Sequence, residues 1–106
     1  MLGFSLNERK EPRKRIFITR LVLDVVKPHN PSIVELGEAI ASLPGVKKVD
    51  IDVKDYDQNI ERLRLVAVGD NLNFDEIREV VRRHGGNVAS LDGVSTQGEI
   101  EEEEEE

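Results

Sequence analysis

Apolar and polar residues follow strand-like spacing in four segments of this chain. Residues 16–26 are mostly β-branched and aliphatic, which predicts a strand in the middle of a sheet. Residues 46–57 and 60–69 alternate apolar and polar side chains with a period of two, which predicts two strands with one solvent-exposed face. The turn between them predicts that they form a hairpin. Residues 87–94 are shorter and predict a last strand.

Two helices are predicted between these strands from their caps and apolar stripes. Ser32 with Glu35 forms a capping box at the start of the first helix, and Asn73 with Glu76 occupies the same positions in the second. Pro44-Gly45 and Gly85-Gly86 end them. The stripes are Ile33, Leu36, Ile40 and Leu43 in the first helix and Phe74, Ile77, Val80 and Val81 in the second.

The order strand, helix, strand, strand, helix, strand defines the expected fold class. Two split β-α-β units give an α+β, ferredoxin-like βαββαβ sandwich, a four-stranded antiparallel sheet with two helices on one face. Right-handed crossovers place the first and third strands in the middle. Residues 1–14 are expected to form a disordered basic arm, 15–95 the ferredoxin-like domain, and 96–106 a disordered acidic tail.

The first strand carries Asp24 in the middle of an aliphatic run. Odd positions, from Phe17 to Val25, should face the helices, and even positions, from Ile18 to Val26, should lie on the open face of the sheet. Asp24 is then expected to form an ion pair with its neighbours on the third strand, Arg62 and Arg64. Val22, Val26, Val66 and Val68 share that face and are expected to be exposed, which suggests that a second copy covers it. The predicted interface residues are Arg20, Val22, Asp24, Arg62, Arg64 and Val66.

The formal net charge of -7 belongs to the C-terminal end of the chain. Glu99 and Glu101 to Glu106 supply seven acids, which leaves 15 acidic and 15 basic residues in the rest. A neutral body makes nucleic-acid binding unlikely, and the open face has no aromatic residue to stack on bases. The chain has no cysteine, which excludes disulfides, thiolate metal sites and a cysteine nucleophile. Its 35% charged residues resemble the composition of proteins from heat-loving prokaryotes.

No apolar run is long enough to span a membrane, and residues 1–6 are followed by charges rather than by a signal-peptide core. We therefore expect a cytoplasmic protein without a membrane partner.

The acidic turn of the hairpin is the one candidate metal site. Asp55, Asp57 and Asn59 match positions one, three and five of a calcium-binding loop. Position six, however, is Ile60 instead of glycine, and position twelve is Val66 instead of glutamate. Two interpretations remain, a Ca²⁺ or Mg²⁺ site and a solvated turn. No other cofactor is expected.

No catalytic constellation emerges from the sequence, and we expect a protein without enzymatic activity. Ser32 is explained by its role as a helix cap. His29, between Pro28 and Asn30, is expected to lie in a loop.

The segments RLVLDVVKPHNPSIVELGEAI and NLNFDEIREVVRRHGGNVASLDGV resemble the small archaeal proteins of domain of unknown function 211, over residues 16–95. The resemblance implies a ferredoxin-like fold similar to the ACT domains, self-association and no established activity. The leading hypothesis is an oligomeric binding or regulatory module whose small-molecule ligand is unknown. The alternatives are a divalent-cation-binding protein that uses the acidic hairpin and an ACT-like small-molecule sensor.

Overall fold

The structure is a computed structural model that describes residues 12–101. Residues 1–11 and 102–106, which hold most of the expected basic arm and half of the expected acidic tail, lie outside the described residues. The elements follow in the predicted order: β1 (Lys14–Pro28), α2 (Ile33–Ala41), β2 (Val46–Tyr56), β3 (Ile60–Gly69), α3 (Phe74–Arg83) and β4 (Asn87–Ile100). Neither helix in residues 12–101 is long and apolar enough to cross a membrane.

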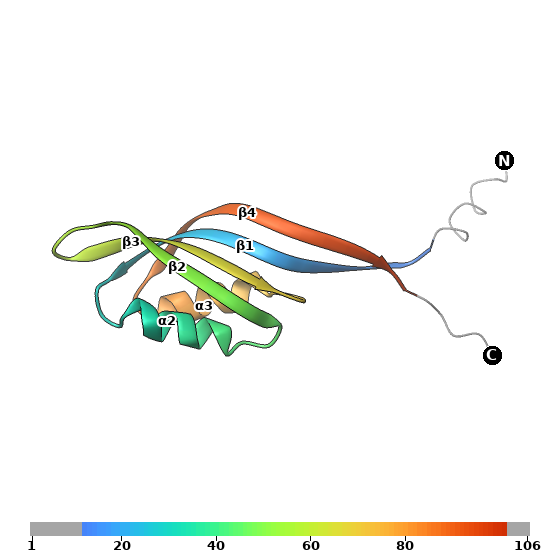
Figure 1. The fold of residues 1–106 in the computed structure, drawn as a ribbon, viewed down its shortest axis with the longest axis horizontal. Helices are drawn as coiled ribbons and strands as arrows, with labels where there is room; N and C mark the ends of the chain where they lie inside the picture. The colour runs from blue at the N-terminus through green and yellow to red at the C-terminus, as the bar shows by residue number, and fades with distance from the viewer. Residues whose placement is uncertain (1–11, 102–106) are drawn as a thin grey trace.

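The four strands form one antiparallel sheet in the order β2-β3-β1-β4. The first and third strands are central, as predicted. Both helices lie on the same face of the sheet, and within residues 12–101 the opposite face carries no helix (Figure 1). The ferredoxin-like prediction is confirmed.

The core lies between the helices and the odd positions of the two central strands. Leu21, Leu23 and Val25 of β1 stand opposite residues 67, 65 and 63 of β3, and all six side chains are buried. The predicted helix stripes meet them: Leu36 and Ile40 from α2 and Ile77, Val80 and Val81 from α3 are buried in the same cluster.

Both predicted helix caps are present. In α2 the Ser32 Oγ accepts a hydrogen bond from the Glu35 backbone N–H at 3.2 Å, and the Glu35 carboxylate accepts one from the Ser32 N–H at 3.0 Å. In α3 the Asn73 side chain accepts a bond from the Glu76 N–H at 3.1 Å. Each bond satisfies a backbone donor that the first helical turn leaves without an intrahelical acceptor.

Three register shifts interrupt the pairing of β1 with β4. Each leaves one residue without a partner: Thr19 on β1, and Ala89 and Asp92 on β4. The shift at Thr19 reverses the alternation at the start of β1, so Ile18 packs against the core. The prediction that Phe17 faces the helices and Ile18 the open face is therefore wrong, because the in-out alternation of side chains along β1 changes phase at the Thr19 bulge.

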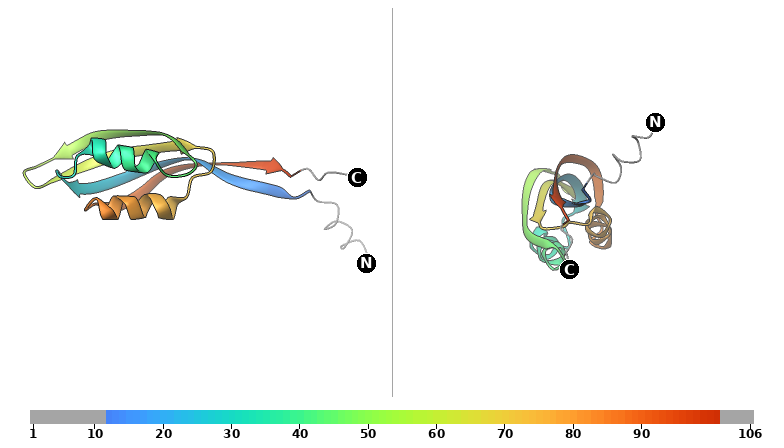
Figure 2. Two further views of the ribbon diagram at one scale, coloured as in Figure 1. Left: turned by 90° about the horizontal axis from the view of Figure 1, so that it is seen from below. Right: turned by 90° about the vertical axis from the view of Figure 1, so that its right-hand side faces the viewer.

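β1 and β4 continue beyond the body of the sheet as a two-stranded ribbon. β3 pairs with β1 only from Arg20 onward, whereas residues 14–18 pair with residues 96–100. Figures 1 and 2 show these two segments extending past the ends of both helices. Residues 96–100 thus belong to β4 rather than to the beginning of a disordered tail, and β4 continues past residue 95, where the domain was expected to end. The local sequence, rich in hydroxyl and glycine residues, gives little sign of a strand there.

Gly69 provides a test of the packing at the end of β3. A Cβ at this position would overlap the carbonyl oxygen of Gly45 and lie 2.9 Å from Leu72 Cδ2. We expect Gly69→Ala to lower the free energy of unfolding by about 1 to 3 kcal/mol in a denaturant titration.

Gly37, inside α2, is the matched control, because a Cβ there would make only an ordinary 3.6 Å contact with Ile51. Gly37→Ala should raise the stability by about 0.5 to 1 kcal/mol, since alanine favours a helix interior. Equal effects of the two substitutions would contradict this account of Gly69.

Candidate functional site

The open face of the sheet carries rows of charged side chains across β2, β3 and β1. Asp52, Arg64 and Asp24 stand side by side in one row, with alternating charge. Asp55 and Arg62 begin the next row toward the hairpin. This arrangement follows from the period of two, which brings the even positions of β1 and β3 to the face that the helices leave open.

Asp24 forms the predicted ion pair, and its partner is Arg62. Arg62 Nη2 lies 2.9 Å from Asp24 Oδ2, and Arg62 Nε donates to Oδ1 at 3.2 Å. Arg64 is the Cα partner of Asp24, yet the bonds come from Arg62 on the diagonal. The hydrogen bonds from Arg62 lower the pKa of the Asp24 carboxyl, against a smaller opposing effect of desolvation.

None of the four valines of the open face is fully exposed, contrary to the prediction: Val26 and Val68 are half-buried, and Val22 and Val66 are buried. Val22 and Val66 are only 6% and 8% exposed within a single chain. They face each other across β1 and β3, and Gly93 of β4 lies against Val22. The sheet is also strongly twisted when viewed along its length (Figure 2). These two side chains therefore offer a second copy almost no surface, and what the predicted interface presents is mainly its charged residues.

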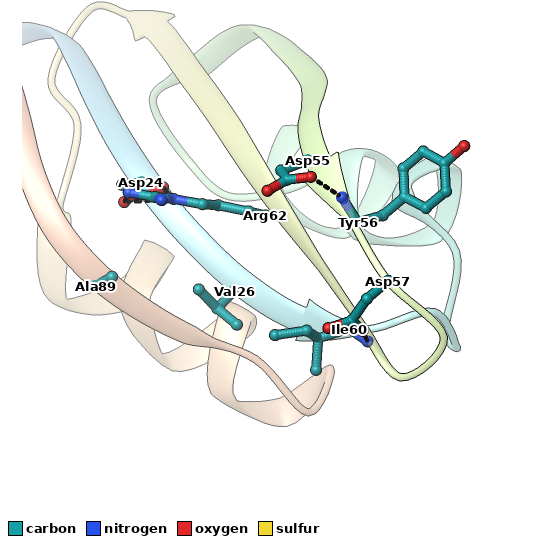
Figure 3. Close-up of a pocket in the computed structure, with 8 residues that line it drawn as sticks. All are labelled: Asp24, Val26, Asp55, Tyr56, Asp57, Ile60, Arg62 and Ala89. Atoms are coloured by element: carbon teal, nitrogen blue, oxygen red, sulfur yellow. Dashed lines mark hydrogen bonds and ion pairs between the residues drawn. The ribbon is translucent and has the colours of Figure 1, made fainter.

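A pocket of about 320 Å³ lies on the open face beside the Asp24–Arg62 pair. Figure 3 shows Val26, Ile60 and Ala89 on one side of it and the carboxylate of Asp55 near Arg62. The Tyr56 ring points away from the other labelled side chains and stands at the rim. The pocket thus combines an apolar patch with charged groups, as binding pockets commonly do.

A second pocket, of about 450 Å³, adjoins the first and shares Asp24, Asp55 and Arg62 with it. Its remaining lining residues are Leu23, Lys54, Arg64 and Asp92. We call the two pockets together the open-face hollow. Its charges are mixed, with arginine and lysine at the Arg64 end and an excess of carboxylates at the hairpin end.

Several residues that line the hollow were not predicted as site residues, and two of them come from β4. Ala89 and Asp92 are the unpaired residues of the two β4 bulges, so their side chains escape the regular alternation. The glycine that follows Asp92 was the available signal, because glycine inside a strand often marks a bulge.

The candidate metal ligands form a hydrogen-bonded turn. Asp57 Oδ1 accepts bonds from the backbone N–H groups of Ile60 at 2.9 Å and Asn59 at 2.8 Å, which lower the pKa of its carboxyl. Asp55 Oδ1 accepts the Tyr56 N–H at 2.9 Å. Within residues 12–101 no group of three or more histidine, cysteine or acidic side chains is arranged to hold a metal ion. In the single chain these carboxylates therefore act on the backbone of the turn.

A buried lysine lies beside Glu61, at the hairpin end of β3. Lys27, at the end of β1, is 1% exposed, and its Nζ donates to the carbonyl oxygen of Pro28 at 2.8 Å and to that of Pro31. The same Nζ lies 3.7 Å from Glu61 Oε1. A buried charge needs such partners, because the low-dielectric interior strongly disfavours an uncompensated ion.

His29 connects the loop after β1 to the hairpin. Its Nδ1 lies 3.1 Å from Glu61 Oε2, and its Nε2 lies 2.7 Å from the carbonyl oxygen of Asp57. Both partners are acceptors, so both ring nitrogens donate only when the imidazole is protonated. The bond to the Asp57 carbonyl and then the bond to Glu61 raise the pKa of His29. Sequence patterns assigned this histidine to a loop but could not show what it contacts.

The fold and the open-face hollow define the class of protein: a small α+β protein of ferredoxin-like architecture whose charged sheet face lies opposite both helices of the described residues. The model of domain of unknown function 211, described as "Uncharacterized ArCR", matches residues 19–106, and the chain belongs to this family. The chain is also 38% identical to the uncharacterised protein MJ0319 of Methanocaldococcus jannaschii over 86 residues, which cover 81% of this chain and 89% of that protein.

The two bonds of His29 predict how the stability of the protein depends on pH. Because its pKa is raised in the folded state, its stabilising contribution is fully present below about pH 6.5 and is lost as the pH rises through the raised value. We expect an NMR titration to place the pKa of His29 above its ordinary value. His29→Ala should lower the denaturation midpoint more at about pH 5.5 than at about pH 9.

Glu61→Gln is the control, since it keeps the shape of the side chain and removes the charge that faces His29. The pKa of His29 should fall toward its ordinary value in this variant. A wild-type pKa of His29 at or below the ordinary value would rule out the bridging role.

Proposed function

We propose that this protein is a self-associating, non-enzymatic binding module whose ligand site is the open-face hollow. The observation that carries the proposal is the hollow itself: two adjoining pockets, on the sheet face that the helices leave open, share Asp24, Asp55 and Arg62.

The chemistry of the hollow suits the binding of a small charged molecule. The guanidinium of Arg62 is held in place by three hydrogen bonds to Asp24, so it is oriented before any ligand arrives. Val26, Ile60 and Ala89 supply apolar contact area beside it. A fixed cation next to apolar surface and to carboxylates that form no ion pair within residues 12–101 can select a ligand by both charge and shape.

The residues that could have suggested catalysis have structural roles. The Ser32 hydroxyl caps α2, and both ring nitrogens of His29 face acceptors. These contacts support a binding role without a chemical step.

Self-association is supported by the surface that residues 12–101 of a single chain leave uncovered. β4 is an edge strand of 14 residues, and Leu91, Val94 and Ile100 on it are each about half exposed or more. A long edge strand with apolar side chains commonly pairs with another chain. A core of this size also gives limited stability to a monomer.

The first test is the mass of the native protein in solution. We expect light scattering after size-exclusion chromatography to give a multiple of the 12.0 kDa chain mass at micromolar concentration. A 12 kDa species at every concentration would reject the self-association half of the proposal.

The second test is a thermal-shift screen with amino acids and nucleotides as probes. A probe present at about 100 times its dissociation constant adds about 2.7 kcal/mol to the stability, which raises the melting temperature by about 10 °C or more. Arg64→Ala and Asp55→Ala should reduce this shift, because both side chains line the hollow.

Arg78→Ala is the matched control, since Arg78 lies on α3 and pairs with Asp75 outside the hollow. It should leave the shift unchanged. The hollow is not a ligand site for these classes if no probe stabilises the wild type, or if the Arg78 variant loses as much as the other two.

A further inference from the structure

The ribbon formed by the ends of β1 and β4 carries an apolar strip on the side of the sheet that faces the helices. Leu91 and Val94 stand opposite the core residues Leu23 and Leu21, which places them on that face. Ile16 lies two positions from the core-facing Ile18 and covers Gly98, so it shares the face. The last strip residue, Ile100, stands opposite Lys14.

Nothing in residues 12–101 covers the outer part of this strip. Ile16 is 64% exposed and Ile100 is 60% exposed. Both helices end before the ribbon (Figures 1 and 2), and β3 does not pair with it. A two-stranded ribbon is at best marginally stable alone in water, so exposed isoleucines at its end favour contact with another surface.

The same chain has an apolar groove that fits such a contact. It lies between α2 and β2, has a volume of about 320 Å³, and is lined by Ile33, Val34, Gly37, Glu38, Val49 and Ile51. Val34 is 62% exposed although it is aliphatic. Gly37 deepens the groove, because it brings no side chain to the helix surface that faces Ile51.

Charge is complementary between the two surfaces. Lys14 lies on the strip side of the ribbon, where it packs beside Gly98 with Ile16. Glu38 lies in the lining of the groove. Neither residue forms an ion pair within the part of the chain that the structure describes. An opposite pair at the edge of an apolar contact fixes its register and disfavours wrong alignments.

We propose that the ribbon of one copy docks in the α2/β2 groove of the next copy, head to tail. The inference rests on the self-association in the proposed function and names its contact surface. A chain cannot fill its own groove, because Ile51 of the groove lies on β2, two strands away from β1 and level with Leu23, about 23 Å along the strand from Ile16. The ribbon and the groove are different surfaces, so the contact is heterologous and leaves one free ribbon and one free groove until a ring closes.

The test uses two variants that each disable one side of the contact. Ile16→Ser with Ile100→Ser removes the strip from the ribbon, and Val34→Arg blocks the groove. All three side chains are mostly exposed, so the fold should persist, as circular dichroism can verify. Each variant alone should run in light scattering at a lower mass than wild type, close to a single chain.

Mixing the two variants distinguishes the head-to-tail contact from other arrangements. The ribbon variant keeps an intact groove and the groove variant keeps an intact ribbon, so the mixture should form a one-to-one heterodimer of about 24 kDa, twice the 12.0 kDa chain. A symmetric ribbon-to-ribbon contact would give no heterodimer and would overturn the proposal.

A charge exchange provides an independent check. Lys14→Glu should weaken assembly, and Lys14→Glu together with Glu38→Lys should restore it, because the pair is re-formed with reversed sign. Oligomers of unchanged mass in the ribbon and groove variants would overturn the docking while leaving self-association intact. A monomeric wild type would overturn both.

Discussion

The pairing of β1 with β3 is the constraint on which the rest of the structure depends. Side chains alternate between the two faces of a strand, so this register sends Leu21, Leu23 and Val25 into the core and Asp24 to the opposite face. A slip of one residue would expose the leucines and bury the aspartate. The same pairing brings Arg62 within reach of Asp24, and thus the core and the open-face hollow are fixed by one alignment.

The bulges change what this regular pattern would otherwise produce. If β4 paired with β1 without the bulges at Ala89 and Asp92, its side chains would alternate regularly between the two faces. These two residues would then not both line the hollow. The bulge at Thr19 keeps the apolar side of the ribbon continuous with the core face of the sheet. Irregular pairing therefore shapes both the hollow and the ribbon, in agreement with the frequent occurrence of bulges at sheet edges and binding sites.

Much of the fold was predictable from the sequence because its signals are local. The helix caps at Ser32 and Asn73, the apolar stripes and the hairpin alternation each depend on residues a few positions apart, and all are present in the structure. The burial of Val22 was not predictable, because it depends on Gly93 and on the twist of the sheet. The cluster of Lys27, His29 and Glu61 joins positions more than thirty residues apart, and periodicity carries no information about such contacts.

The two edges of the sheet differ in a way that limits how it can grow. β2 carries Lys47, Lys48, Asp50, Asp52 and Lys54, a density of charge that discourages another strand from adding beside it. The described part of β4 has Asp92 and Glu99 as its acidic residues and no basic residue, with glycine and hydroxyl side chains between them. Addition of a further strand to the body of the sheet is therefore favoured beside β4 and disfavoured beside β2, so the charge pattern of the two edges gives the sheet a direction of growth.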